Sequence, residues 1–260
     1  MDGLLINSED KLTQGMNQLL EKYGRPPLTG HVRAKLMGVP NSSNGDVFHD
    51  WAKLPISREQ WAHESAQQMR LNFPDCKALP GAEELLSNLS RAQVVSSGDP
   101  IAIALASSTK TDMYEVKTSR PDTKRLLDYI PPDRRVLGDD PRLPRGRGKP
   151  APDIYLLALQ QINSVINPEH HIMPDECLVF EDSAVGVEAG RRAGMRVVWV
   201  PHPDMAVEYE PLKEEVLAGR TGLVKIGDEW QLGEMDDGWA EMLPSLEDLD
   251  YERYGIHVPL

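Results

Sequence analysis

The sequence predicts an α/β protein: a parallel sheet covered by helices on both faces, with an all-helical segment inserted near the start of the chain. Two observations lead to this fold class. From residue 79 onward, short runs that are apolar at nearly every position alternate with helical patterns, as expected of strands buried on both faces. Between Ser8 and about Met69, apolar residues instead recur at helical spacing. We therefore expect a helical lobe and an α/β core.

The helical lobe is expected over residues 12–78. Its first helix is indicated by "DKLTQGMNQLLEKYG", in which leucine and methionine side chains share one helical face and Gly24 follows as a stop. A second helix should begin after Ser57, which is placed to be its N-cap, with Gln60 three residues on as its capping-box partner.

The α/β core is expected over residues 1–11 and 79–226. Residues 227–260 are rich in acidic side chains and weakly periodic, which predicts an acidic C-terminal extension that is solvated or loosely docked. The expected elements of the core are, in order, a helix in "GAEELLSNL", a strand over 101–106, the segment "RVLGDD", a helix over 152–162, a strand over 177–180, a helix in "AVGVEAGRRAG" and a strand in "MRVVWVP".

Composition excludes several classes of function. Lys and Arg number 28 against 41 Asp and Glu, a net charge of −13, which argues against a nucleic-acid-binding protein. The two cysteines, Cys76 and Cys177, show no metal-site or disulfide spacing. No apolar run is long enough for a membrane span, and no basic-then-apolar signal stands at the start. We expect a soluble, cytoplasmic protein, a monomer or weak oligomer, with no nucleic-acid or membrane partner.

Chemistry-bearing residues follow the predicted strands at their carboxyl ends, where ligands bind in such sheets. Ser107 and Ser108 end the strand over 101–106, and Glu181 and Asp182 end the strand over 177–180. Each has an ordinary structural explanation, because serine is common in turns and Asp182 could simply cap the next helix.

Two further segments should meet the same edge of the sheet. Lys149 lies on a Gly- and Pro-rich loop just before a helix, and Asp2-Gly3 would end a strand if one preceded it. Carboxylates gathered at one place need a cation, and oxygen ligands suit Mg²⁺. A magnesium ion, a lysine and a hydroxyl together suit a phosphate group. The joint pattern therefore predicts a phosphate-handling site.

These segments resemble the motifs of the haloacid dehalogenase-like (HAD) phosphohydrolases. "MDGLLINSE" is similar to the first motif, DxDG, from its second position on; "IALASS" resembles the second, "GKPAPDIY" the third and "LVFEDSAVGVEAGRRAGM" the fourth. The likeness runs from Met1 to about Pro201. "FPDCKALPGAEEL", "YEVKTSR" and "VLGDDP" further resemble the pseudouridine-5'-phosphatase-like branch. The resemblance implies a HAD-like Rossmann-type sheet with a mobile helical cap inserted after the first motif.

The resemblance also implies roles for the motif residues. Ser107 would hydrogen-bond the transferring phosphoryl oxygens, and Lys149 would neutralise phosphate and nucleophile. Asp182 would bind Mg²⁺, with Glu181 acting directly or through water. Asp2 would be the general acid and base and would bind the metal through its carbonyl oxygen. An aspartyl-phosphate would form and then be hydrolysed by water.

Substrate contacts are expected from both lobes. Gly3 and Ser108 would line the phosphate site, and the cap offers Arg33 and Lys35 in "GHVRAKLMGVPNSSN" as candidates for the leaving group. Each of these two could equally be an exposed polar group at a helix end.

The first motif lacks its first aspartate. The resemblance places the attacking residue two positions before Asp2, where the sequence has no residue, and the first central strand is missing with it. We expect a truncated reading frame. The alternatives are a shortened protein that binds phosphate without catalysis, and an enzyme with another nucleophile.

The predicted function is Mg²⁺-dependent hydrolysis of a small phosphomonoester, a sugar phosphate or a nucleotide-like compound such as pseudouridine 5'-phosphate. Two alternatives stay open: a catalytically inactive phosphate-binding or regulatory protein, and a sugar phosphomutase.

Overall fold

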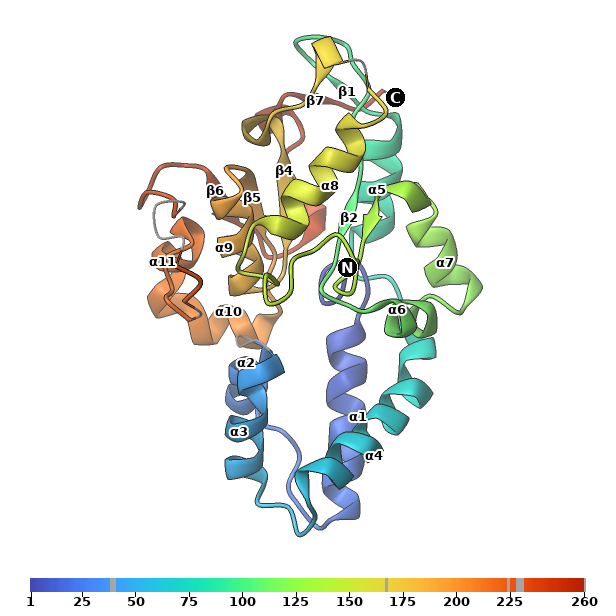
Figure 1. Ribbon diagram of the computed structural model, residues 1–260, viewed down its shortest axis with the longest axis vertical. Coiled ribbons are helices and arrows are strands. Elements are labelled where there is room, and N and C mark those ends of the chain that lie inside the picture. Colours follow the sequence, from blue (N-terminus) through green and yellow to red (C-terminus); the bar gives the residue numbers. More distant parts are fainter. Residues whose placement is uncertain (38–40, 167, 224, 228–231, 260) are drawn as a thin grey trace.

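The computed structural model describes residues 1–37, 41–166, 168–223, 225–227 and 232–259. The chain forms two lobes, a helical lobe and a larger α/β core, with the N-terminus where they meet (Figure 1). Among the described residues, no helix combines the length and the apolar character that crossing a membrane requires.

The helical lobe has its own apolar centre. The rings of Phe48 and Trp61 stack at 4.8 Å there, packed with Leu19 and Leu20. Ser57 caps the fourth helix by accepting a hydrogen bond from the backbone of Gln60, so the predicted N-cap is confirmed. The lobe consists of α1 (Ser8–Lys22), α2 (Gly30–Met37), α3 (Asn41–Ala52), α4 (Arg58–Asn72) and the short turn η1 (Phe73–Asp75).

The core is a set of short strands between helices, in the order that the sequence predicts. Its helices are α5 (Ala82–Arg91), α6 (Thr111–Lys117), α7 (Pro121–Leu127), α8 (Asp153–Asn163), α9 (Ala184–Arg192), α10 (Pro203–Tyr209) and α11 (Lys213–Ala218). Its strands are β1 (Gln93–Val94), β2 (Leu105–Ala106), β3 (Arg135–Val136), β4 (Leu178–Glu181), β5 (Arg196–Trp199), β6 (Ala240–Met242) and β7 (Ile256–His257).

The pairing of the strands confirms a parallel arrangement. β2 pairs in parallel with β3, and β4, β5 and β6 form a second parallel group, with Phe180 opposite Val198 and Val198 opposite Glu241. The two groups are separate sheets among the described residues. The division falls between the β2–β3 pair and the group of β4, β5 and β6.

The C-terminal segment corrects one prediction. A solvated or loosely docked tail was expected, and this is wrong for residues 240–257. β6 extends the sheet beside β5, β7 pairs antiparallel with β1, and Leu246, Leu249 and Ile256 are buried in the core. β5 would otherwise be an open edge, which β6 covers. The few buried residues are too widely spaced among acidic ones to produce a readable periodicity.

Two adjacent segments of the chain, around Asn7 and around Lys77, connect the lobes. The backbone N–H of Asn7 donates to the carbonyl of Lys77 at 3.0 Å, and the N–H of Lys77 donates to Asn7 Oδ1 at 2.8 Å. Next to this pair, Leu79 donates to the carbonyl of Leu5 at 2.9 Å. The entry and exit of the helical lobe are thus held side by side, and α1 begins at Ser8, inside the segment predicted to belong to the core.

Candidate active site

Lys149 joins three of the predicted motifs. Its Nζ lies 2.5 Å from Glu181 Oε1 and donates to the carbonyl of Ala106 at 3.2 Å. Ala106 ends β2 and precedes Ser107, and Glu181 ends β4. The lysine side chain is only 9% exposed. The loops after β2 and β4 and the loop before α8 therefore meet at one ammonium group.

Glu181 is a buried anion surrounded by donors. Its Oε1 also accepts from the Tyr155 hydroxyl at 2.6 Å, and its Oε2 accepts from the backbone of Asp182 and from both the backbone and the hydroxyl of Ser183 at 3.0–3.1 Å. Burial works to raise the pKa of Glu181, but Lys149, with the Tyr155 hydroxyl and the N-terminal ammonium, outweighs it and lowers the pKa to about 2. Because both oxygens are engaged, the arrangement suits an indirect role for this carboxylate.

Asp182 lies where negative charge accumulates. Burial raises its pKa well above the usual value, and the neighbouring carboxyls of Glu181 and Glu9 add to the effect. Its main-chain carbonyl accepts from the Trp199 indole at 3.0 Å, which fixes the loop. A Cβ at Gly3 would overlap the Asp182 carboxyl, so the start of the chain passes directly against it. A buried carboxyl crowded by others is the donor type that Mg²⁺ would stabilise.

Asp2 is held by three donors from three parts of the chain. Its Oδ1 accepts from the Ser8 hydroxyl and from Lys117 Nζ, both at 2.6 Å, and its Oδ2 accepts from the Thr109 hydroxyl at 2.6 Å. Burial works to raise the pKa of Asp2, but the Lys117 ammonium, with the N-terminal ammonium and the Ser8 hydroxyl, outweighs it and lowers the pKa to about 2. Asp2 is therefore an oriented carboxylate.

The two serines after β2 differ in their surroundings. Ser107 is buried, its backbone N–H donates to the carbonyl of Val136, and its hydroxyl accepts from the backbone of Thr109 at 3.2 Å. Ser108 is exposed, and its carbonyl lies so close to Gly138 that a Cβ there would overlap it. The strand end thus presents one enclosed and one accessible hydroxyl.

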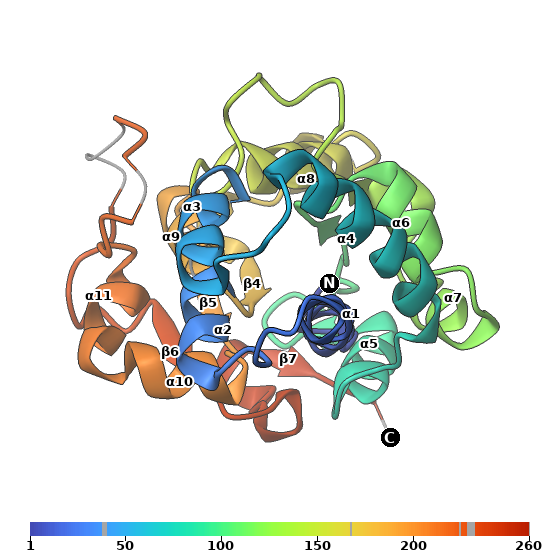
Figure 2. The same cartoon turned by 90° about the horizontal axis from the view of Figure 1, so that it is seen from below.

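Arg33 and Lys35 lie apart from this group, on α2. Arg33 pairs with Asp10 at 2.5 Å and with Asp204 of α10 at 3.4 Å, and Lys35 is exposed. Over the described residues, no contact joins either side chain to Asp2. Arg33 therefore links the helical lobe to the core, where α2 faces α10 (Figures 1 and 2).

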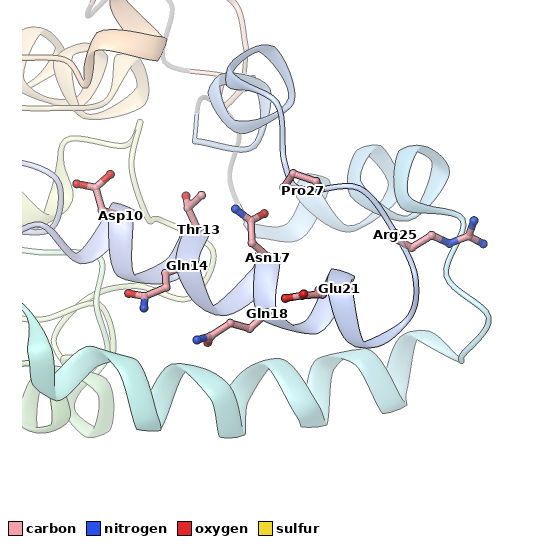
Figure 3. Close-up of a pocket in the computed structure, with 8 residues that line it drawn as sticks. All are labelled: Asp10, Thr13, Gln14, Asn17, Gln18, Glu21, Arg25 and Pro27. Carbon is pink, nitrogen blue, oxygen red and sulfur yellow. The ribbon is translucent and has the colours of Figure 1, made fainter.

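A groove of about 710 Å³ runs along α1, starting at Asp10. Figure 3 shows its side chains along the helix, with Arg25 and Pro27 on the loop that follows. Asn17, in its wall, accepts from the backbone of Leu28. The groove is lined by Asp10, Thr13, Gln14, Asn17, Gln18, Glu21, Arg25 and Pro27.

Three of the residues that hold the site were not predicted to have a role. Lys117 and Tyr155 stand within quoted segments and Thr109 directly follows one, but a lysine at a helix end, a threonine after a strand and a tyrosine in an apolar helix carry no distinctive pattern. Only the tertiary contacts bring them to Asp2 and Glu181.

Comparison with known proteins gives consistent matches. Residues 1–200 match the family described as haloacid dehalogenase-like hydrolase. A probable pseudouridine-5'-phosphatase of Saccharomyces cerevisiae is 36% identical over 257 residues, covering 98% of this chain and 94% of that protein. A probable pseudouridine-5'-phosphatase of Drosophila melanogaster is 32% identical, covering 84% and 86%. The crystal structure of a putative beta-phosphoglucomutase from Thermotoga maritima superposes with a TM-score of 0.55 at 28% identity, over 84% and 94% of the two chains.

Proposed function

The chain belongs to the haloacid dehalogenase-like hydrolase family, and from this we propose that it hydrolyses a small phosphomonoester with the help of Mg²⁺. The observation that carries the proposal is the contact of Lys149 with the last residues of β2 and β4, Ala106 and Glu181, which directly precede Ser107 and Asp182. A cation, a hydroxyl and a crowded carboxyl at one place are what a phosphate group and a metal require.

The proposed roles follow from these surroundings. Ser107 binds phosphoryl oxygens, and Lys149 offsets the charge of the phosphate. Asp182 and the carbonyl oxygen of Asp2 would hold Mg²⁺, which when bound neutralises charge on the phosphoryl group. Glu181, with both oxygens engaged, supports the metal indirectly by fixing Lys149 and the loop of Asp182.

Asp2 performs the proton transfers of the proposed reaction. In the first step the carboxylate of the family's attacking aspartate bonds to phosphorus, the bond from phosphorus to the leaving oxygen breaks, and Asp2, which enters this step in its protonated form, gives that oxygen its proton. In the second step Asp2 takes a proton from water, which attacks the aspartyl-phosphate and releases inorganic phosphate. The carboxylate that the first transfer leaves on Asp2 is the form that takes a proton from water, and its three donors orient it for this second transfer.

We propose a sugar phosphate or nucleotide-like phosphate as the substrate, with pseudouridine 5'-phosphate as the first candidate, because two relatives are named as probable pseudouridine-5'-phosphatases. Gly3 and Ser108 line the phosphate end. Arg33 and Lys35 remain candidates for contacts with the leaving group, and Arg33 would then have to exchange an ion pair for the substrate.

The test is phosphate release from a panel of phosphomonoesters that includes pseudouridine 5'-phosphate, with and without Mg²⁺. The family pattern places the attacking aspartate before Met1, so the assay uses the gene product with any residues encoded in frame upstream. We expect Mg²⁺-dependent release that falls by roughly 100-fold or more in Asp182→Asn. Binding of phosphate esters in calorimetry without release would instead indicate a non-catalytic binding protein.

A phosphomutase is the second candidate, favoured by the likeness to the putative beta-phosphoglucomutase. A mutase must return the phosphoryl group to a second hydroxyl instead of to water. Isomerised sugar phosphate in the product mixture, detected by NMR, would identify it, whereas free phosphate alone supports hydrolysis.

A further inference from the structure

Lys117 is a buried cation outside the residues to which the proposed chemistry assigns a role. It is the last residue of α6 and is 7% exposed. A buried ammonium is costly unless its partners replace the water it loses. The partners of Lys117 therefore indicate what it does.

Lys117 acts on both oxygens of the Asp2 carboxylate. Its Nζ donates to Asp2 Oδ1 at 2.6 Å and to Thr109 Oγ1 at 3.0 Å. The Thr109 hydroxyl in turn donates to Asp2 Oδ2 at 2.6 Å. Because that hydroxyl has a single hydrogen, the donation from Lys117 fills a lone pair of Thr109 and leaves its hydrogen directed at Oδ2. One oxygen is thus held directly and the other through Thr109.

An aromatic ring also lies against the ammonium. Nζ lies 4.6 Å from the centroid of the Phe73 ring, and Phe73 is 5% exposed. Phe73 begins η1, where the chain leaves the helical lobe, and η1 packs against α6. A ring face attracts a cation and excludes water from it. Lys117 therefore has one defined position, set by the linker between the lobes.

Stability alone gives a weak reason for such an arrangement, because apolar residues of similar size often replace a buried ion pair without loss. What the arrangement adds is a fixed direction for a carboxylate. We propose that Lys117 is a positioning residue that holds the Asp2 carboxylate in the orientation needed for its proton transfers. The proposal rests on the proposed function of Asp2. Lys117 touches no reacting atom and moves no proton.

Geometry explains why orientation matters. A general acid or base must lie within hydrogen-bond reach of the atom it serves, and Asp2 must serve the leaving oxygen and then the attacking water. Misplacing a catalytic group by about 1 Å can reduce a rate roughly 100-fold. A carboxylate that loses Lys117 also loses the constraint on Thr109, so both of its oxygens become free to turn.

The experiment is a double-mutant cycle of Lys117→Met and Asp2→Asn in the gene product assayed above. An aryl phosphate is the common substrate, since its leaving group departs as an anion and keeps the Asp2→Asn background measurable. We expect Lys117→Met to lower kcat roughly 10- to 100-fold with KM changed less than about threefold. In the Asp2→Asn background the same substitution should change kcat less than about twofold. Lys124→Met, on the exposed face of α7, is the matched control and should leave kcat unchanged.

If Lys117→Met lowered kcat equally with Asp2 and with Asn at position 2, Lys117 would act independently of Asp2 and the proposal would be overturned. An unchanged kcat in Lys117→Met would also overturn it. If Lys117→Met does not fold, as judged by thermal unfolding, Thr109→Val removes the relay to Oδ2 alone. It should lower kcat only when Asp2 is present, and full activity would again overturn the proposal. If the unsubstituted protein releases no phosphate from any ester, the proposed function fails and the role of Lys117 with it.

Discussion

Lys149 and Glu181 form an ion pair whose side chains are 9% and 6% exposed. Removing one member of such a pair leaves an uncompensated buried charge, which costs about 3–5 kcal/mol. We expect Lys149→Met to lower the free energy of unfolding at pH 7 by about this amount, measured by urea denaturation. Lys124→Met, which removes an exposed lysine, should change it by less than about 0.5 kcal/mol.

The pH dependence of this pair has a definite sign. The pKa of Glu181 is lowered to about 2 because Lys149 outweighs its burial, so the pair contributes stability above the ordinary carboxyl pKa and loses it as the pH falls toward about 2. Without Lys149, burial is less well offset and the carboxyl accepts a proton more readily. The difference between Lys149→Met and the unsubstituted protein should therefore shrink from pH 7 to about pH 4. An equal difference at both pH values would contradict this.

Position 186 has no room for a side chain, because the carboxylate of Glu181 occupies that space. A Cβ at Gly186, in the first turn of α9, would overlap that carboxyl group, which its five hydrogen bonds prevent from moving away. We expect Gly186→Ala to destabilise the fold by about 1–3 kcal/mol, seen as a lower Tm. Gly148→Ala, where a Cβ meets nothing within 4 Å, is the control and should leave the Tm nearly unchanged.

At the scale of elements, the C-terminal segment docks on the start of α5 at Gly81. This glycine has φ +75°, and a Cβ there would lie 2.7 Å from the backbone nitrogen of Glu247. Gly98 also has φ +75° but has nothing within 4 Å. Gly98→Ala should therefore lower the free energy of unfolding only through the strain of the left-handed conformation, by about 1–2 kcal/mol. Gly81→Ala should lower the free energy of unfolding, measured by urea denaturation, by about 1–3 kcal/mol more than Gly98→Ala, because the segment around Glu247 must move away. Equal losses in the two variants would mean that this segment is only loosely docked.

The elements that the sequence predicts are those whose signals are local. Alternating apolar runs and helices predicted the parallel sheet, and short motifs predicted Ser107, Lys149 and Asp182, since strand ends, loops and caps are read from neighbouring residues. Lys117 and Tyr155 could not be found in this way. Their hydrogen-bond partners lie more than twenty residues away in the sequence, and only packing brings these together. The same holds for β6, which becomes a strand by pairing with β5.

At the scale of the whole molecule, Arg33 connects the helical lobe to the core. It lies between Asp10 and Asp204, and its side chain is 13% exposed whereas theirs are 49% and 35%. Because the acidic partners are open to water, we expect Arg33→Met to weaken the contact by about 1 kcal/mol. Hydrogen exchange in α2 and α10 should accelerate roughly fivefold, measured by mass spectrometry. His31→Gln removes a more exposed pair with Glu208 and should have a smaller effect; unchanged exchange in Arg33→Met would contradict the link.

The two ends of the chain share one apolar core, and this has a consequence for folding during synthesis. Leu4, Leu5 and Ile6 belong to the same cluster as Leu246 and Ile256, whereas the apolar centre of the helical lobe lies within residues 19–61. The helical lobe can therefore fold while the ribosome is still translating. The core must wait for its last residues, so a nascent chain arrested before β6 should present a protease-resistant helical lobe beside a core that is still digestible.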